Sequence, residues 1–316
     1  MKLLIGTDEA GYGPNLGPLV ITGTSFLLPD DLSASELWSV LEDVLTDRPT
    51  RNDARLHVAD SKQIYSSGRS IRSLETSVLA LVGISGHQPA SPTDFGRIVN
   101  GPEFEQRYAN IPPQPLPSLT LPVAANPAVV QVATDRLKAA LQRHDIQLVD
   151  VQSQILFPSE FNDGVRQYET KGRLLSTITL KLIRQLVDGF TTKSGFVVCD
   201  KHGGRNRYDD LIADAFDDKF VFRIEESGPQ SRYRMGDLEF CFRTKAEELL
   251  PVAFASMVSK YVREITMLQF NAFWQQHLPD LKPTKGYPVD AARFRDQIAD
   301  VVERIGMDWN DLWRFR

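Results

Sequence analysis

The chain has 316 residues, a hydrophobic share of 42% and a formal net charge of −5. This length fits one elaborated domain or two small ones. The sequence has no apolar run as long as a membrane span and no signal-peptide pattern, and its two cysteines exclude a disulfide framework. We therefore expect a soluble, cytoplasmic, monomeric protein, whose acidic charge gives no indication of nucleic-acid binding.

The first element is a short apolar run, residues 2–7, which is typical of a buried strand. Two adjacent carboxylates, Asp8 and Glu9, follow in a glycine-rich turn, and residues 19–27 predict a second strand that completes a hairpin. Neighbouring strand residues face opposite ways, so both acids can reach one site only where the strand ends. We expect it to end near Gly11 and Gly13; a solvated turn is the alternative.

The next stretch begins with a predicted helix over residues 32–46 and continues with Asp60, Ser61 and Lys62 ahead of another helix over residues 74–82. Taken alone, these three polar residues are typical of a helix cap. Residues 84–128 then hold nine of the nineteen prolines, from Pro89 to Pro127. Because proline blocks helix interiors and central strands, this segment is expected to be largely irregular, either an insertion beside the core or a linker.

An alternation of helices and strands follows. A helix that starts at Asn126 and Pro127, a strand over 146–156 and an amphipathic helix over 165–187 lead to an apolar strand, residues 195–200. This succession predicts an α/β fold with a parallel component. The last strand ends in Asp200, where functional sites of open α/β sheets gather; an N-capping aspartate beside a solvated basic loop is the alternative.

The loop after Asp200 contributes Arg205 and Arg207 as candidate phosphate contacts and His202 as a candidate general acid or phosphate contact. Strands over 220–224 and 238–243, with a turn at 235–237, come next. Lys245 and Glu247 then precede a helix that continues to residue 264. Acids in the first turn of a helix are also favoured by its dipole, so a purely structural role for Glu247 stays open.

Several of these strings resemble, in the same order, the motifs of the type 2 ribonucleases H (ribonucleases HII and HIII): residues 8–13, residues 60–62, the strand that ends at Asp200, residues 245–247 and residues 285–287. The resemblance implies that Asp8, Glu9, Asp200 and Glu247 hold catalytic metal. It departs from the family at Tyr12, where an arginine is usual, and at Glu247, where an aspartate is usual. Glu248 and Glu264 are competing candidates.

The substrate contacts that we infer combine residues of these motifs with nearby cations. Backbone around the first glycines would recognise the 2′-hydroxyl, cations would bind phosphates, and a tyrosine would stack near the tail. The residues are Gly11, Tyr12, Gly13, Asp60, Ser61, Lys62, Arg205, Arg207, Lys245 and Tyr287.

Carboxylates gathered at one point cannot all stay ionised without a cation, and oxygen ligands suit Mg²⁺ or Mn²⁺. We expect two such ions, as in two-metal phosphodiester hydrolysis. The predicted fold is an α/β, ribonuclease H-like mixed sheet flanked by helices: a core over 1–264 that includes the Pro-rich insertion at about 84–128, and a C-terminal helical extension over 265–316 packed on the core.

The expected function is metal-dependent hydrolysis of the RNA strand of RNA–DNA hybrids. Two alternatives remain open: a nuclease of the same fold that acts on another structured nucleic acid, because Tyr12 replaces arginine, and an inactive nucleic-acid-binding homologue, because of Glu247 and the altered loop after Asp200.

Overall fold

The structure, a computed structural model, describes residues 1–50, 53–59, 64, 70–190 and 194–315. The motif Asp60, Ser61 and Lys62 therefore lies outside the described residues. None of the helices within these ranges has both the length and the apolar character that crossing a membrane requires.

A seven-stranded mixed sheet forms the centre of the molecule, in the order β5-β2-β1-β6-β9-β8-β7. β1 pairs antiparallel with β2 and parallel with β6, and β6 pairs parallel with β9. The predicted hairpin and the predicted parallel component are both confirmed. The strands are β1 (Lys2–Ala10), β2 (Leu19–Leu28), β5 (Gln147–Leu156), β6 (Gly195–Asp200), β7 (Phe222–Glu226), β8 (Gln230–Met235) and β9 (Leu238–Arg243); β3 (Leu45–Thr46) and β4 (Leu56–His57) form a small separate sheet.

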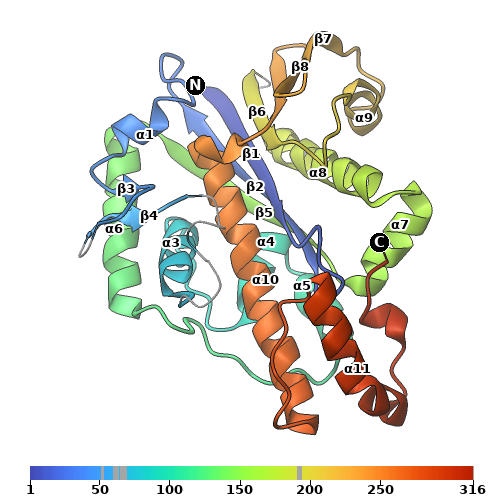
Figure 1. Cartoon of the computed structure of the whole chain (residues 1–316). Helices are drawn as coiled ribbons and strands as arrows, with labels where there is room; N and C mark the ends of the chain where they lie inside the picture. The colour runs from blue at the N-terminus through green and yellow to red at the C-terminus, as the bar shows by residue number, and fades with distance from the viewer. Residues whose placement is uncertain (51–52, 60–63, 65–69, 191–193, 316) are drawn as a thin grey trace.

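Helices cover both faces of the large sheet, as predicted for this fold class. Figure 1 shows α10 running along β1 and β2 on one face, and α8 lying on the other side. Each face of the sheet has its own hydrophobic core, and successive residues of β1 point alternately into the two cores. Leu4 belongs to the core on the α10 side, and Leu3 and Ile5 belong to the core on the α8 side. The helices are α1 (Leu37–Val40), α3 (Arg72–Gly83), α4 (Pro92–Asn100), α5 (Phe104–Ala109), α6 (Pro127–Arg143), α7 (Pro158–Tyr168), α8 (Lys171–Asp188), α9 (Asp209–Ala215), α10 (Leu250–His277) and α11 (Pro288–Ile305).

Two predicted helices are wrong in extent. The helix expected over 165–187 is two helices, α7 and α8, because Glu169 adopts a left-handed φ of 66° and the Thr170 side chain caps the new helix by accepting from Arg173 N. The helix expected over 32–46 shrinks to the four residues of α1. There the carboxylate of Glu36 accepts hydrogen bonds from the Ser33 amide and hydroxyl, which favours a turn.

The Pro-rich segment packs on the core, and two short helices, α4 and α5, interrupt it. Its residues 84–91, 101–103 and 110–126 are irregular, as expected. Its last part is fixed by Glu75, a fully buried residue of α3. The Glu75 carboxylate accepts hydrogen bonds from the amides of residues 123–125, each at 2.7 Å, and from the Tyr261 hydroxyl at 2.8 Å. These contacts favour an insertion rather than a free linker.

The C-terminal part continues directly from the core. The predicted boundary at residues 264 and 265 lies inside α10, which runs without interruption from Leu250 to His277. α11 then packs on α10 through Phe294, whose ring lies 5.7 Å from that of Phe270 and 6.5 Å from that of Trp274. The extension is therefore a further layer on one long helix (Figure 1).

Candidate active site

Two aspartates, Asp8 and Asp200, occupy the carboxyl ends of the neighbouring parallel strands β1 and β6. The paired register of these strands reaches Thr7 opposite Cys199, so one further step brings Asp8 level with Asp200. Residues that lie level on adjacent strands project from the same face, with strands about 4.8 Å apart. The sequence-based expectation that these two acids share one end of the sheet is supported by this register.

The shared face is the one that α10 covers. The side chain of Ser256, on α10, forms a hydrogen bond with the Asp8 carboxylate, and Ser259 Oγ donates to the Asp8 carbonyl at 3.1 Å. The approach is close because residue 6 is glycine: a Cβ at Gly6 would lie 2.5 Å from the backbone of Pro251. A small residue two positions before the acid thus lets the helix reach Asp8.

The surroundings of Asp8 disfavour its ionised form. Burial raises the pKa of Asp8 well above its ordinary value, and the negative charges of Glu9 and Asp200 raise it further, while the hydrogen bond from Ser256 opposes the shift. Three carboxylates therefore lie close enough to interact electrostatically. Within the described ranges, however, no group of three or more His, Cys, Asp or Glu side chains is arranged to hold a metal ion.

Glu9 differs from its predicted setting. β1 ends at Ala10, next to Gly11 as expected, but Asp8 and Glu9 lie within the regular strand, so their side chains project from opposite faces. Glu9 accordingly belongs to the α8 side, where its charge adds to burial in raising the pKa of Tyr12. The charge of Glu9 acts on Asp8 from the opposite face of β1, and the two acids do not share a turn.

The fourth predicted ligand, Glu247, follows a tight turn. Lys245 has a left-handed φ of 57°, and the next residue, Ala246, directs its amide at Asp200 Oδ1 at 3.5 Å. Glu247 lines a hollow of about 560 Å³ together with Trp38, Lys245 and Arg55. Glu247 therefore directly follows the residue whose amide contacts Asp200. The charges that act on Asp8 are those of Glu9 and Asp200.

The two competing acids have other partners. Glu248 forms an ion pair with Arg243 at 2.7 Å. Glu264 is buried and lies 2.7 Å from Lys260 Nζ and 2.5 Å from Lys285 Nζ. Burial alone would raise the pKa of Glu264, but the charges and hydrogen bonds of these two lysines lower it overall. Both acids are thus bound to cations of the protein itself.

The loop that begins at Gly11 is held by two buried arginines that sequence reasoning missed. Arg314 Nη1 donates to the Gly11 carbonyl at 2.5 Å, and Arg263 donates to the Pro18 carbonyl at 2.7 Å and to the Leu16 carbonyl at 3.0 Å. Gly11 has a φ of 90°, which only glycine adopts easily. Each arginine is hundreds of residues from the loop in sequence, so no local pattern predicts these contacts.

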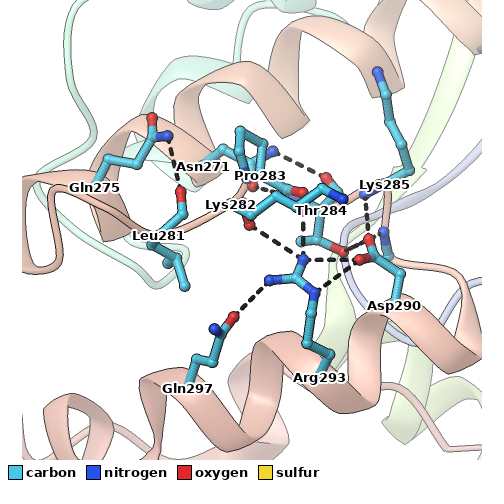
Figure 2. A network of polar contacts seen from close by, with 11 residues as sticks. Asn271, Gln275, Leu281, Lys282, Pro283, Thr284, Lys285, Asp290, Arg293 and Gln297 are labelled. Carbon is cyan, nitrogen blue, oxygen red and sulfur yellow. Dashed lines mark hydrogen bonds and ion pairs between the residues drawn. The ribbon is translucent and has the colours of Figure 1, made fainter. Parts of the chain in front are cut away.

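The segment with Tyr287 docks on the same loop. The Gly286 carbonyl accepts from the amides of Asn15 at 2.8 Å and Leu16 at 3.3 Å. Figure 2 shows how the preceding turn is fixed: Asp290 accepts from Thr284 Oγ1 and from Arg293, and Arg293 also donates to the carbonyl of Lys282. The Tyr287 side chain is left 55% exposed, which is compatible with the predicted stacking role.

The basic loop after β6 is partly internal. Lys201 Nζ donates to Asn206 Oδ1 at 2.6 Å and to the Ser227 carbonyl at 2.7 Å. His202 is buried, its Nδ1 lies 3.0 Å from Ser176 Oγ, and burial with the charge of Arg205 lowers its pKa to about 3. The prediction that His202 contacts phosphate is wrong, because its ring is neutral and enclosed.

The outward side chains of this loop are Arg205 and Arg207. Arg207 is exposed and lies 3.5 Å from Asp209. The charge of Arg205 acts on Tyr12, where it opposes burial and the charge of Glu9, which together raise the pKa of Tyr12. Asp200 and Lys245 both line a hollow of about 380 Å³ beside the loop. Of the predicted phosphate contacts, Lys245 therefore borders Asp200, and Arg205 and Arg207 lie in the adjacent loop.

The fold and the site together define an α/β protein with interacting carboxylates at the carboxyl ends of two parallel strands. No protein-family model and no curated protein match the sequence. Solved structures that resemble the chain include ribonuclease HII of Archaeoglobus fulgidus, in a complex with PCNA (14% identity, covering 99% of this chain and 94% of that chain, TM-score 0.47). Another is Bst-RNase HIII in complex with Mn²⁺ (14% identity, covering 99% of this chain and 66% of that chain, TM-score 0.46). A third is ribonuclease H2 of Pyrococcus horikoshii OT3 (12% identity, covering 98% of this chain and 92% of that chain, TM-score 0.45). At such identities and TM-scores, activity has to be argued from the side chains.

Proposed function

We propose that the chain is a metal-dependent endonuclease that hydrolyses the RNA strand of RNA–DNA hybrids. The observation that carries this proposal is the placement of Asp8 level with Asp200 at the carboxyl ends of β1 and β6, with Glu9 adjacent. A protein gains no stability from crowding buried carboxylates in this way, since each raises the pKa of the others. Such an arrangement is typical of a functional site.

The donor chemistry fits a hard divalent cation. Carboxylate oxygens are the ligands that Mg²⁺ and Mn²⁺ prefer, and a cation would relieve the repulsion that raises the pKa of Asp8. Asp8, Glu9 and Asp200 would hold the metal, with Glu247 as the fourth ligand. When bound, metal of this kind supplies activation of water and stabilisation of the leaving 3′ oxygen.

The chain's own residues orient these acids and the substrate. Ser256 and the Ala246 amide constrain the carboxylates of Asp8 and Asp200. The backbone from Gly11 to Gly13, which Arg314 holds in place, is available to contact a 2′-hydroxyl, the group that distinguishes RNA from DNA. Exposed cations nearby would bind backbone phosphates as salt-sensitive contacts.

Cleavage of an end-labelled RNA–DNA hybrid, with and without Mn²⁺, tests the proposal. We expect the RNA strand to be cut at internal positions only with metal, and Asp8→Asn to remove the activity. Asp237→Asn is the matched control, because Asp237 is exposed in the turn between β8 and β9, beyond the opposite ends of the strands. Equal loss of activity in both variants would contradict the assignment of Asp8.

A binding protein without catalysis is the second candidate. It is favoured by the finding that the described residues contain no three potential ligands arranged to hold an ion. In that case the hybrid would be bound and left intact with either Mg²⁺ or Mn²⁺. Cleavage of a different structured nucleic acid in preference to the hybrid would instead support the other nuclease alternative. The cytoplasmic, monomeric state stays a prediction.

A further inference from the structure

Two chain segments meet at the side chain of Tyr12. Lys171, the first residue of α8, places its Nζ 4.7 Å from the centre of the Tyr12 ring. A Cβ at either Gly172 or Gly203 would lie 3.5 Å from the Tyr12 hydroxyl. The start of α8 and the basic loop after β6 therefore flank one hydroxyl, and glycine on each side leaves it uncovered.

The negative charge that acts at this point is that of Glu9. Among the residues that the structure describes, Lys171 and Arg205 take part in no ion pair, and the Tyr12 hydroxyl makes no hydrogen bond. Arg223 and Arg232, by contrast, are paired with Asp209 and Glu239, each at 2.6 Å. The ammonium of Lys171, the guanidinium of Arg205 and the Tyr12 hydroxyl thus lie near one another, and none of them donates a hydrogen bond to a residue that the structure describes.

The position of Lys171 in its helix strengthens this point. The amino-terminal end of an α-helix carries partial positive charge, so a cation in the first turn is unfavourable there and an anion is favourable. Lys171 begins α8, a helix of 18 residues whose first turn contains no acid. Helix stability therefore does not account for this lysine, whereas a bound anion would.

We propose that Lys171, Arg205 and the Tyr12 hydroxyl bind one backbone phosphate of the nucleic acid, beside the phosphate that is cleaved. The inference rests on the proposed function, because the location follows from Glu9, whose charge acts on Tyr12. This proposal adds Lys171 to the predicted substrate contacts. Tyr12 would donate a hydrogen bond from its hydroxyl, and its ring would position the Lys171 ammonium. The three donors suit phosphate oxygens, which accept hydrogen bonds and carry negative charge.

The test measures binding of a short RNA–DNA hybrid to the full chain that carries Asp8→Asn, so that the substrate stays intact. Titrations at several salt concentrations between about 50 and 200 mM give the slope of log affinity against log salt. In this background, Lys171→Gln is expected to weaken binding by about tenfold and to reduce the slope by about 0.9, the value of one lost phosphate contact on a duplex. Tyr12→Phe is expected to weaken binding with little change in slope, because it removes a hydroxyl and no charge.

Lys181→Gln is the matched control. Lys181 lies on the same helix, with its Nζ 5.7 Å from the Tyr168 ring centre and 3.1 Å from the Tyr168 hydroxyl, so it forms the same kind of lysine–tyrosine pair at a different place. Its replacement should leave the affinity and the slope unchanged. The melting temperature of Lys171→Gln should be unchanged or raised, because the change removes a cation from the positive end of α8.

The outcomes separate this inference from the proposed function. If Lys171→Gln binds with the same affinity and slope as its parent, and the wild-type chain still cleaves the hybrid, the phosphate site is refuted and the nuclease function stands. The same conclusion follows if Lys171→Gln and Lys181→Gln lower the slope equally. If the parent chain does not bind the hybrid at any salt concentration, both proposals fail.

Discussion

Replacing His202 by glutamine should change how the stability of the protein depends on pH. His202 is 4% exposed, lies 3.0 Å from Ser176 Oγ and packs edge-on against Tyr208 and Phe242. Burial, followed by the charge of Arg205, lowers its pKa from 6.5 to about 3. The folded protein therefore holds this ring neutral in a range where the unfolded chain binds a proton.

The sign and size of the effect follow from that shift. Between pH 6.5 and about pH 3 the unfolded state carries more protons at this position, so the free energy of unfolding falls as the pH falls. One proton contributes about 1.4 kcal/mol per pH unit, which amounts to about 2 kcal/mol between pH 7 and pH 5. Glutamine can still hydrogen-bond to Ser176 and does not titrate, so this contribution should disappear.

Urea unfolding of the wild type and of His202→Gln at these two pH values measures the difference. His87→Gln is the control, because His87 is an exposed histidine outside the core. Between pH 7 and pH 5, the free energy of unfolding of the wild type and of the His87 variant should fall by about 2 kcal/mol more than that of His202→Gln. Equal losses in all three proteins would refute the reasoning and show that the ring is protonated in the fold.

Three further predictions concern the site. Asp8→Asn should abolish hybrid cleavage while the melting temperature at neutral pH stays unchanged or rises, because it removes a buried carboxylate whose pKa is raised; a large loss of stability would indicate a structural role. Glu247→Gln should lower Mn²⁺-dependent cleavage about tenfold or more, whereas Glu248→Gln should change it about twofold at most, since it breaks an exposed ion pair; anomalous scattering from Mn²⁺ located at Glu264 alone would contradict this. Long hybrids should be cleaved better than a lone ribonucleotide in duplex DNA, with Tyr12→Arg narrowing the difference because arginine can pair bidentately with phosphate; at matched ionic strength, equal cleavage of both substrates by the wild type would count against it.

Local patterns in the sequence predicted the elements that carry the acids. β9 begins and ends as expected, β6 ends at Asp200 as expected, and α6 begins behind the predicted cap, Asn126. These elements were predictable because strands and helix caps follow rules that operate over a few residues. The strand β8 was missed, since its alternation is obscured by polar residues such as Arg232 and Arg234.

The sequence by itself therefore determined that β6 ends at Asp200 and that two adjacent carboxylates lie near the end of β1. Only the tertiary structure decided how they face: the extension of β1 to Ala10 puts Glu9 on the side opposite Asp8, and the β1–β6 register puts Asp8 level with Asp200. Packing likewise brought Arg314 to Gly11, across almost the whole chain. The reason is physical: strand ends are set by neighbours in the chain, whereas register, facing and long-range hydrogen bonds depend on which surfaces meet when the core closes.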